Sequence, residues 1–395
     1  MSSRKVVITG IGMVSSLGEG WEQNWRALNA APLAANVDSE RFAPYSVHPL
    51  PEIDWSTQIA KRGDLRQMDA WQRLGVHTAG LALDDAGMKG DEALCGTMDM
   101  IVAAAGGERD IAVDEAILEA ARTSNDRDVM LNEKLTTELR PTLFLAQLSN
   151  LMAGNVSIVH KVTGSSRTFM GEEGSGIAAV EDAAARIRSG QSSHVLVGAA
   201  HQTEGMDFLL TVDLGQHLHR GAMAPLWQRA ESAGGGVVLG SASAFLVLEE
   251  EAHARARGAR IYAAIDAVVS DQVRRDQASY AGHLADLFSP LLEQAHGALL
   301  VSGASGADFA TAAEAEALQR FDGFTLRSMA AATGHLKEAQ LPFAVALAAL
   351  AVHHGKAYPQ WSPDHDSAEA GTVTSAVATA VGFNRAEGAA RIVKA

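Results

Sequence analysis

Three things are scarce in this sequence, and each scarcity excludes a class of function: cysteine, positive charge and long apolar runs. Cys95 is the one cysteine in 395 residues. This excludes an internal disulfide framework and a metal site made of several cysteines. We expect Cys95, in the stretch DEALCGTMDM, to be a small buried side chain and not a reactive thiol.

Positive charge is outweighed by negative charge in the chain as a whole. Lysine and arginine number 32 against 47 aspartates and glutamates, which gives a formal net charge of -15. Binding to nucleic acid needs a basic face that neutralises phosphates, so we expect no nucleic-acid partner. The same negative charge would repel an acidic protein partner.

No apolar run is long enough to cross a membrane. The longest, Leu341 to Val352 with Pro342 included, has twelve residues and predicts a buried core helix. The first residues, MSSRKVVITG, pass directly into a strand pattern without a signal-peptide apolar region, so we expect a cytoplasmic protein with no membrane contact.

The sequence offers no sign of a metal or a nucleotide cofactor. The histidines outside the motifs discussed below stand apart from aspartate, glutamate and cysteine at the spacing of metal ligands, so no metal is expected. The glycines of AAAGGERD lack a nucleotide-binding fingerprint, and no cofactor is expected there.

Short β-branched runs that end in glycine alternate with helical patterns along the chain, which is typical of helices packed on mostly parallel sheets. The clearest strands are KVVITGIG, MIVAAAGG, SHVLVGAA, GALLVSGAS and FTLRSMAAA. The helical patterns cover Trp71 to Ala86, Phe144 to Asn155, Gly174 to Ser189, Glu314 to Arg320 and Gly334 to His354. In the helix from Gly174, the residues Ile177, Val180, Ala184 and Ile187 form one stripe that we expect to face the core.

Strand-helix-strand units can be matched between the two ends of the chain. IVAAAGG pairs with LLVSGAS, and a bend, a helix and a strand follow each. The sequence therefore predicts an internally duplicated α/β fold, with residues 1–250 as the first half and 251–395 as the second. The polar segment 111–140 is expected to be a loop-like or lid-like insertion in the first half.

The stretch TFMGEEGSGIAAVEDAAARIRSG, residues 168–190, has a short apolar run, a glycine-rich bend and a helical pattern. Bends of this build often present a nucleophile, yet this one holds Glu172 and Glu173. The helix dipole and the free N–H groups of a first turn favour a carboxylate, so we expect Glu173 to stay ionised. Glu172 is expected to be solvated or paired.

Several segments, in order along nearly the whole chain, resemble the β-ketoacyl-acyl-carrier-protein synthases, a family with the thiolase fold. They are RKVVITGIGMVSSLGEGWEQNWRAL, LRQMDAWQRLGVHTAGLALDDAGM, NLMAGNVSIVHKVTGSS and GGGVVLGSASAFLVLEEEAHARARGA. The resemblance implies a thiolase-like α/β fold of two duplicated halves in five layers, α-β-α-β-α. Fold alone does not fix activity, which depends on the site.

Active members of that family use a cysteine at the bend, two histidines and a lysine. Counting from Gly164 onto the family's bend places Glu173 at the cysteine position. The stretch LVSGASGAD places Gly303, to within a residue, at the first histidine, and SMAAATGHLKEA places Ala330 at the lysine. His335 alone matches, as the second histidine, and without its partners we favour a structural role for it.

The stretch VGFNRAEGAARIV resembles the family's Gly-Phe-Gly-Gly loop, whose phenylalanine gates access to the cysteine. Phe383 matches the phenylalanine, but Asn384 and Arg385 replace the flexible glycines. Because glycine tolerates backbone angles that asparagine and arginine do not, we expect a stiffer loop than a working gate needs.

These losses resemble one kind of family member, the chain-length factor, which is a catalytically silent synthase homologue. The resemblance implies a heterodimer with an active β-ketoacyl synthase subunit, in which this chain shapes the tunnel of a growing acyl or polyene chain. Leu143, Phe144 and Leu148 are the candidates for tunnel-facing or interface positions. The acyl carrier protein would then dock mainly on the partner. An aryl-polyene or other type II polyketide pathway, or a fatty-acid-like one, is implied.

Two enzymatic alternatives stay open. One is a malonyl-acyl-carrier-protein decarboxylase that supplies starter units, although stabilising the enolate there would need both histidines, and Gly303 and Ala330 count against it. The other is a condensing enzyme that uses Glu173 through a mixed anhydride, which would require an activated setting for the carboxylate.

Overall fold

The computed structural model describes residues 4–107, 109–141, 143–231, 235–275, 279–293, 297–368 and 370–395. The strands are β1 (Val6–Ser15), β2 (Gly18–Glu19), β3 (Val47–His48), β4 (Asp99–Ala103), β5 (Ser166–Phe169), β6 (His194–His201), β7 (Leu239–Gly240), β8 (Ala242–Glu250), β9 (Ala263–Asp271), β10 (Leu299–Ser302), β11 (Thr325–Ser328), β12 (Ser375–Val381) and β13 (Glu387–Val393).

The α-helices are α1 (Gly20–Leu28), α2 (Arg62–Gln67), α3 (Ala70–Asp85), α4 (Glu92–Thr97), α5 (Ile111–Thr123), α6 (Arg127–Thr137), α7 (Leu143–Ala146), α8 (Leu151–His160), α9 (Glu173–Ser189), α10 (Met206–Asp213), α11 (Glu251–Ala256), α12 (Tyr280–Leu292), α13 (Asp308–Leu318), α14 (Ala330–Thr333) and α15 (Gln340–His354). Three short 3₁₀ turns are η1 (Trp55–Thr57), η2 (Leu226–Glu231) and η3 (Lys337–Ala339).

The order of the strands shows that the two halves of the chain repeat one topology. From their junction, the first half runs β1, β8, β6, β4, β5 and the second runs β9, β13, β12, β10, β11. In each half the first two neighbouring pairs are antiparallel and the last two are parallel. Leaving out the two-residue strands, each half therefore places its first, fifth, fourth, second and third strands side by side, as expected of a duplication.

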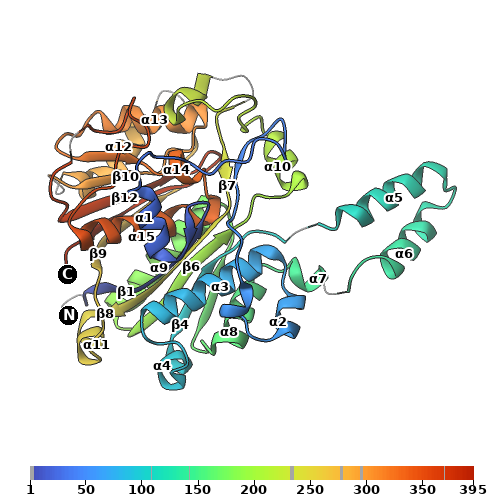
Figure 1. The fold of residues 1–395 in the computed structure, drawn as a ribbon, viewed down its shortest axis with the longest axis horizontal. Coiled ribbons are helices and arrows are strands. Elements are labelled where there is room, and N and C mark those ends of the chain that lie inside the picture. Colours follow the sequence, from blue (N-terminus) through green and yellow to red (C-terminus); the bar gives the residue numbers. More distant parts are fainter. Residues whose placement is uncertain are drawn as a thin grey trace.

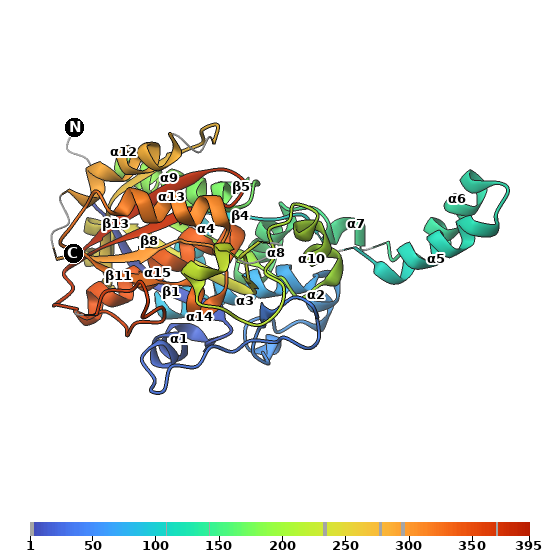
Figure 2. The ribbon, with the colours of Figure 1, turned by 90° about the horizontal axis from the view of Figure 1, so that it is seen from above.

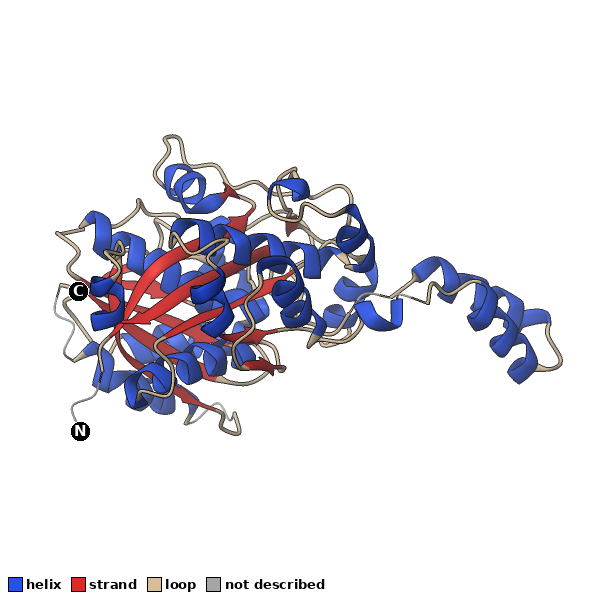
Figure 3. Ribbon diagram, turned by 90° about the horizontal axis from the view of Figure 1, so that it is seen from below, coloured by secondary structure: helices blue, strands red, loops and turns tan. Residues whose placement is uncertain are grey.

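The sheet is continuous, because β1 pairs with β9 at its middle. Each half of the sheet forms one layer, and the helices form three more: one between the two halves and one on each outer face. The two central helices, α9 and α15, pack on each other and on strands from both halves. On the outer faces, α3 and α8 cover the strands of the first half, and α12 and α13 cover those of the second. Figure 3 shows helices on both sides of the strands. The thiolase-like fold of two duplicated halves in five layers is thus confirmed.

Small and apolar residues allow the two central helices to fit between the strands. In α15 every residue from Gln340 to Val352 is buried, so the apolar run that begins at Leu341 is a core helix, as predicted. In α9 the stripe of Ile177, Val180, Ala184 and Ile187 is also buried, as predicted. Alanine is frequent in both helices because they are covered on two faces and have little room for bulk.

Three helix boundaries differ from the prediction. The helix expected from Phe144 to Asn155 is divided into α7 and α8, because serine and asparagine near position 150 favour a helix start over a helix interior. The helix expected from Gly334 begins at Gln340, since Gly334 and Lys337 both have positive φ. The helix expected from Glu314 already begins at Asp308, an acidic residue that favours a first turn.

The segment expected to be a loop-like insertion forms a helical hairpin, here named the arm. Its helices α5 and α6 begin after Asp110 and Asp126, whose carboxylates accept hydrogen bonds from the N–H groups of Val113 and Val129. Figures 1 and 2 show the arm standing away from the body of the molecule. Within the described part of the chain, no helix is long and apolar enough to span a membrane.

Candidate functional site

Glu172 and Glu173 form the bend between β5 and α9. Gly171 has a φ of 133°, and Glu172 has a φ of 57° with a ψ of −139°. The chain therefore turns through backbone angles that favour glycine. The carbonyl of Glu172 accepts hydrogen bonds from the N–H of Ser175 at 3.1 Å and from its hydroxyl at 2.6 Å. These bonds close the first turn and leave Glu173 as the first residue of α9.

Glu173 is completely buried and faces His335, which is also completely buried. The Nε2 atom of His335 donates to Oε1 of Glu173 at 2.5 Å. Burial would raise the pKa of Glu173, but the hydrogen bond from His335 and the charges of His335 and Lys337 outweigh it and hold the pKa below its ordinary value. Glu173 is thus an ionised carboxylate that is already hydrogen-bonded.

The backbone of His335 is fixed on both sides, which aims its ring at Glu173. Its N–H donates to the carbonyl of Val238 at 2.8 Å, and its carbonyl accepts from the N–H of Gly240 at 3.0 Å. The second oxygen of Glu173 points at Gly382, where an added Cβ would lie 2.8 Å away. Among the described residues, that oxygen has no hydrogen-bond partner.

Glu172 pairs with Lys337, a residue of η3 that the sequence analysis did not single out. The Nζ atom of Lys337 donates to Oε1 of Glu172 at 2.9 Å. The same nitrogen lies 5.4 Å from the ring centre of Phe208 and 5.2 Å from that of Phe383, within the range of a cation–π contact. Burial would lower the pKa of Lys337, but the charges of Glu338, Glu172 and Glu173 outweigh it and raise the pKa, so the lysine stays charged.

We name Glu172, Glu173, His335 and Lys337 the corner. A second buried pair lies beside it, where Nδ1 of His201, at the end of β6, is 3.1 Å from Oε2 of Glu338. Burial would raise the pKa of Glu338, but the nearby His201 and the charge of Lys337 lower it. Three carboxylates are therefore gathered with one lysine and two histidines in a largely buried space.

Backbone strain is concentrated around the corner. The described residues include five non-glycine positions with positive φ, and four of these border the corner: Glu172, Gln216, Lys337 and Ala386. Gln216 precedes His217, whose ring centre lies 4.8 Å from that of Phe383, and a Cβ added at Gly174 would lie 2.8 Å from the Cβ of Ala386. Strained positions of this kind cost about 1–3 kcal/mol each and mark functional sites.

The loop of Phe383 closes over the corner. Its ring lies 4.8 Å from that of His217 and 5.6 Å from that of His335, and its side chain is buried. The N–H of Gly382 donates to the carbonyl of Ala386 at 2.9 Å. Asn384 and Arg385 reach Glu172 at 3.4 Å and 3.8 Å, so both residues contact the bend.

Gly303 and Ala330, the two other positions matched to catalytic residues, have surroundings that differ from each other. A Cβ added at Gly303 would lie 2.4 Å from the carbonyl oxygen of Thr379 in β12, so a histidine side chain does not fit there without moving that strand. Ala330 is completely buried and packs with Leu226 and Ala304. Gly303 and Ala330 thus add no ionisable group to the corner, and their assignment to the histidine and lysine positions stays a prediction.

Cys95 does not take part in the corner. It is buried in α4, and its thiol contacts the carbonyl oxygen of Met88 at 3.3 Å. Burial raises the pKa of the thiol, with a smaller contribution from the charge of Asp91. A protonated, enclosed thiol is a poor nucleophile, and the inert role expected of Cys95 agrees with this geometry.

The residues predicted to line a tunnel do not come together around the corner. Leu143 in α7 is buried, with 3% of its surface exposed, and Leu148 is 37% exposed. The side chain of Phe144 lies outside the described residues. Two cavities lie near the corner in the described part of the chain, and neither Leu143 nor Leu148 lines either of them.

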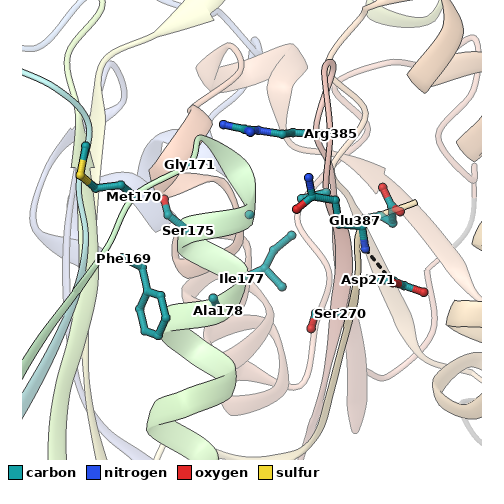
Figure 4. Close-up of a pocket in the computed structure, with 13 residues that line it drawn as sticks. Phe169, Met170, Gly171, Ser175, Ile177, Ala178, Ser270, Asp271, Arg385 and Glu387 are labelled. Carbon is teal, nitrogen blue, oxygen red and sulfur yellow. Dashed lines mark hydrogen bonds between the residues drawn. The ribbon is translucent and has the colours of Figure 1, made fainter. Parts of the chain in front are cut away.

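Two cavities flank the corner. The first, of about 460 Å³, lies along α9 between the end of β5 and the ends of β9 and β13. Figure 4 shows Phe169 and Met170 on one side of it and Arg385 and Glu387 on the other, with Ser175 between them on α9. The second, of about 340 Å³, is lined by His201 and Phe208, by residues 105–107 after β4 and by the end of β6.

Comparisons with known proteins agree on one family. Residues 3–254 match the family model described as "Beta-ketoacyl synthase, N-terminal domain". The chain is 27% identical over 273 residues to 3-oxoacyl-acyl-carrier-protein synthase 2 of Vibrio harveyi, which covers 67% of this chain. The match spans 62% of that enzyme, which is less than two thirds of its length.

Two solved structures share the fold. A β-ketoacyl synthase from Burkholderia phymatum superposes with a TM-score of 0.80 at 22% identity, over 99% of this chain and 100% of that one. The ishigamide ketosynthase/chain length factor superposes with a TM-score of 0.79 at 20% identity, over 100% of both chains. At these identities the likeness concerns the arrangement of the strands and helices.

Proposed function

Because the chain belongs to the β-ketoacyl synthase family, we propose that it is the catalytically silent member of a synthase pair. In this role it is a chain-length factor: it binds an active β-ketoacyl synthase and helps to shape the tunnel in which an acyl or polyene chain grows. The superposition on the ishigamide ketosynthase/chain length factor, at 20% identity, makes the fold compatible with this role.

The buried pair of Glu173 and His335 is the observation that carries the proposal. Acyl transfer from a thioester needs a nucleophile that is reactive and reachable, and a thiolate at a helix start meets both needs. Glu173 is ionised, buried and bonded to His335 at 2.5 Å. A carboxylate stabilised in this way is a weak nucleophile and a poor general acid. The corner therefore preserves the shape of an acyl-transfer site without its reactive group.

The surface beside the corner supports a protein partner. Strand β5 lies at the edge of the sheet, with Ser166 and Arg167 exposed, and no strand in the described part of the chain pairs with its outer side, which can therefore pair with a second chain. Met170, which follows β5, is 63% exposed, and Leu145 and Leu148 are 43% and 37% exposed. Apolar side chains of this size next to an open strand edge fit a protein interface. Leu143, Phe144 and Leu148 remain our candidates for interface or tunnel contacts.

Co-expression with a cysteine-containing synthase of the same family tests the proposal directly. We expect a one-to-one complex, and elongation of an acyl group on the carrier protein only by the complex. The isolated chain should release no carbon dioxide from malonyl-carrier protein. Decarboxylation by the isolated chain that Glu173→Ala abolishes would overturn the silent role and establish the starter-forming alternative.

The same complex tests the proposed contribution to product length. Leu148→Ala should shift the products of the complex towards longer chains, because it removes bulk from the proposed tunnel wall. Thr97→Ala, a substitution in α4, serves as the matched control and should leave product length unchanged. An unchanged product distribution with Leu148→Ala would remove that residue from the tunnel. The proposed product class is an aryl polyene or another type II polyketide.

A further inference from the structure

The two cavities beside the corner are joined by a continuous row of contacts. Arg385 lines the larger cavity, and its Nε atom lies 3.8 Å from Oε2 of Glu172. Oε1 of Glu172 accepts from Lys337 at 2.9 Å. Lys337 in turn lies 5.4 Å from the ring centre of Phe208, which lines the smaller cavity. The pair of Glu172 and Lys337 therefore lies between Arg385 of the larger cavity and Phe208 of the smaller one.

We propose that the Glu172–Lys337 pair is a plug that separates the two cavities and excludes alkyl thioesters from this chain's own corner. The inference rests on the proposed silent role and adds a residue-level reason for it. Lys337 is then a specificity-determining residue: it decides that an acyl chain reaches the partner's site and not this one. On this proposal the two cavities are the ends of one passage, which the pair closes.

The side chain of Lys337 is well suited to close a passage. It is 6% exposed, and its ammonium nitrogen lies 5.4 Å from the ring centre of Phe208 and 5.2 Å from that of Phe383. Because its charge is met by Glu172 and by two aromatic faces, the lysine is stabilised without being solvated. An apolar chain entering the passage would have to displace this nearly buried ammonium group from Glu172 and leave its charge without that partner, which is costly.

The backbone also holds the plug in place. Glu172 has a φ of 57° and Lys337 a φ of 45°, so both partners of one ion pair adopt angles that side-chain-bearing residues rarely take. They lie 165 residues apart along the chain. Two strained positions that meet through a single ion pair indicate that the surrounding structure enforces their contact.

A thiol placed at the corner reports whether the passage is closed. The only native cysteine, Cys95, is buried. Glu173→Cys therefore adds a labelling site to a protein whose native thiol is enclosed. We would measure the rate of alkylation by N-ethylmaleimide and by N-dodecylmaleimide on the isolated full-length chain. The unsubstituted protein gives the rate of Cys95 alone.

Removing the lysine should open the passage. In the Glu173→Cys background, Lys337→Ala should raise the alkylation rate on the order of tenfold or more for both reagents, since labelling of an enclosed thiol follows its exposure. Lys161→Ala is the matched control, because Lys161 is another lysine with positive φ but is exposed at the end of α8. Equal rates with and without Lys337→Ala would overturn the plug.

A second variant guards against a folding defect. Glu172→Gln removes the ion pair from the other side and should also raise the alkylation rate above that of Glu173→Cys alone. If Lys337→Ala does not fold, this variant decides the question, and an unchanged rate overturns the plug. Labelling is measured without a partner subunit. A failed plug would therefore leave complex formation intact, and a failed complex would leave the labelling result valid.

Discussion

The corner and the arm distribute charge and apolar surface in opposite ways. The corner and its neighbouring pair hold Glu173, His335 and Glu338 almost free of solvent contact. The arm presents Leu118 and Val129 to solvent, with 69% and 62% of their surface exposed. A lone folded chain normally does the reverse. The contrast suggests that the corner is built to keep a fixed shape, while the arm is built to meet another surface.

The physical cost of the two arrangements differs as well. A buried ion pair is tolerated only while both partners are present, because a single desolvated charge is very unfavourable. Exposed apolar residues on the arm cost the isolated chain little, since α5 and α6 pack mainly on each other. Substitutions should therefore affect folding at the corner and assembly at the arm.

The largest effect should follow from leaving Glu173 without its partner. We expect His335→Ala to lower the free energy of unfolding by about 3–5 kcal/mol, because it leaves a buried, unpaired carboxylate. Thermal and urea unfolding measure this loss. The double variant Glu173→Leu/His335→Leu should be more stable than His335→Ala, since no charge is then buried alone. A double variant as unstable as the single one would show that the loss comes from a cavity.

Acid should weaken the corner and the neighbouring pair of His201 and Glu338. The folded-state pKa values of Glu173 and Glu338 lie below their ordinary value of 4.5. The unfolded chain therefore takes up these protons first as the pH falls, so the stabilisation present above pH 4.5 is lost as the pH drops through the folded-state values.

The slope of stability against pH between about 6 and 3 measures this effect. Glu173→Gln should flatten the slope. Glu314 provides a contrast of opposite sign, because its pKa is raised by burial despite hydrogen bonds from Thr379 and Ser302. Its contribution is present at low pH and is lost as the pH rises, so Glu314→Gln should not flatten the acid limb. An equal flattening by both variants would contradict this assignment.

Substitutions on the arm should separate folding from assembly. We expect Leu118→Ser together with Val129→Ser to change the free energy of unfolding of the isolated chain by no more than about 0.5 kcal/mol, as is usual for exposed positions. Affinity for the partner synthase should fall roughly tenfold or more, because apolar contact area is lost at an interface. Titration calorimetry checks the second effect. Glu119→Gln, also exposed on α5, serves as the control, and unchanged affinity would remove the arm from the interface.

Much of this architecture could be predicted from local patterns. The apolar stripe of α9 and the run in α15 identify the central helices, and the motif around His335 places it near the bend. The pairing of Glu172 with Lys337 could not be predicted in this way, since the two residues lie 165 positions apart. It depends on η3 and the bend meeting between the two half-sheets, which is a tertiary contact.

Other features have signals in the sequence itself. Lys337, Glu338 and Gln340 are polar residues directly before an apolar run, and such residues next to a core helix require partners. The arm was expected to be loop-like because its composition is polar, although Asp110 and Asp126 stand where helix caps are favoured. The lack of space at Gly303 depends on β12, which lies far away in the sequence.

The smallest effect concerns the loop that joins the corner to the larger cavity. Arg385 lies 3.8 Å from Glu172, and its side chain is 55% exposed, so the ion pair itself contributes little. Arg385→Gly would mainly increase the freedom of the unfolded chain and of the loop, and should destabilise the protein by roughly 0.5–1 kcal/mol. Hydrogen exchange at the N–H of Gly382, which bonds to Ala386, should become faster, while exchange in the arm stays unchanged. If exchange in the loop is as slow as before, the hydrogen bond between Gly382 and Ala386 holds the loop without help from Arg385, and the stiffness of the corner arises from the backbone alone.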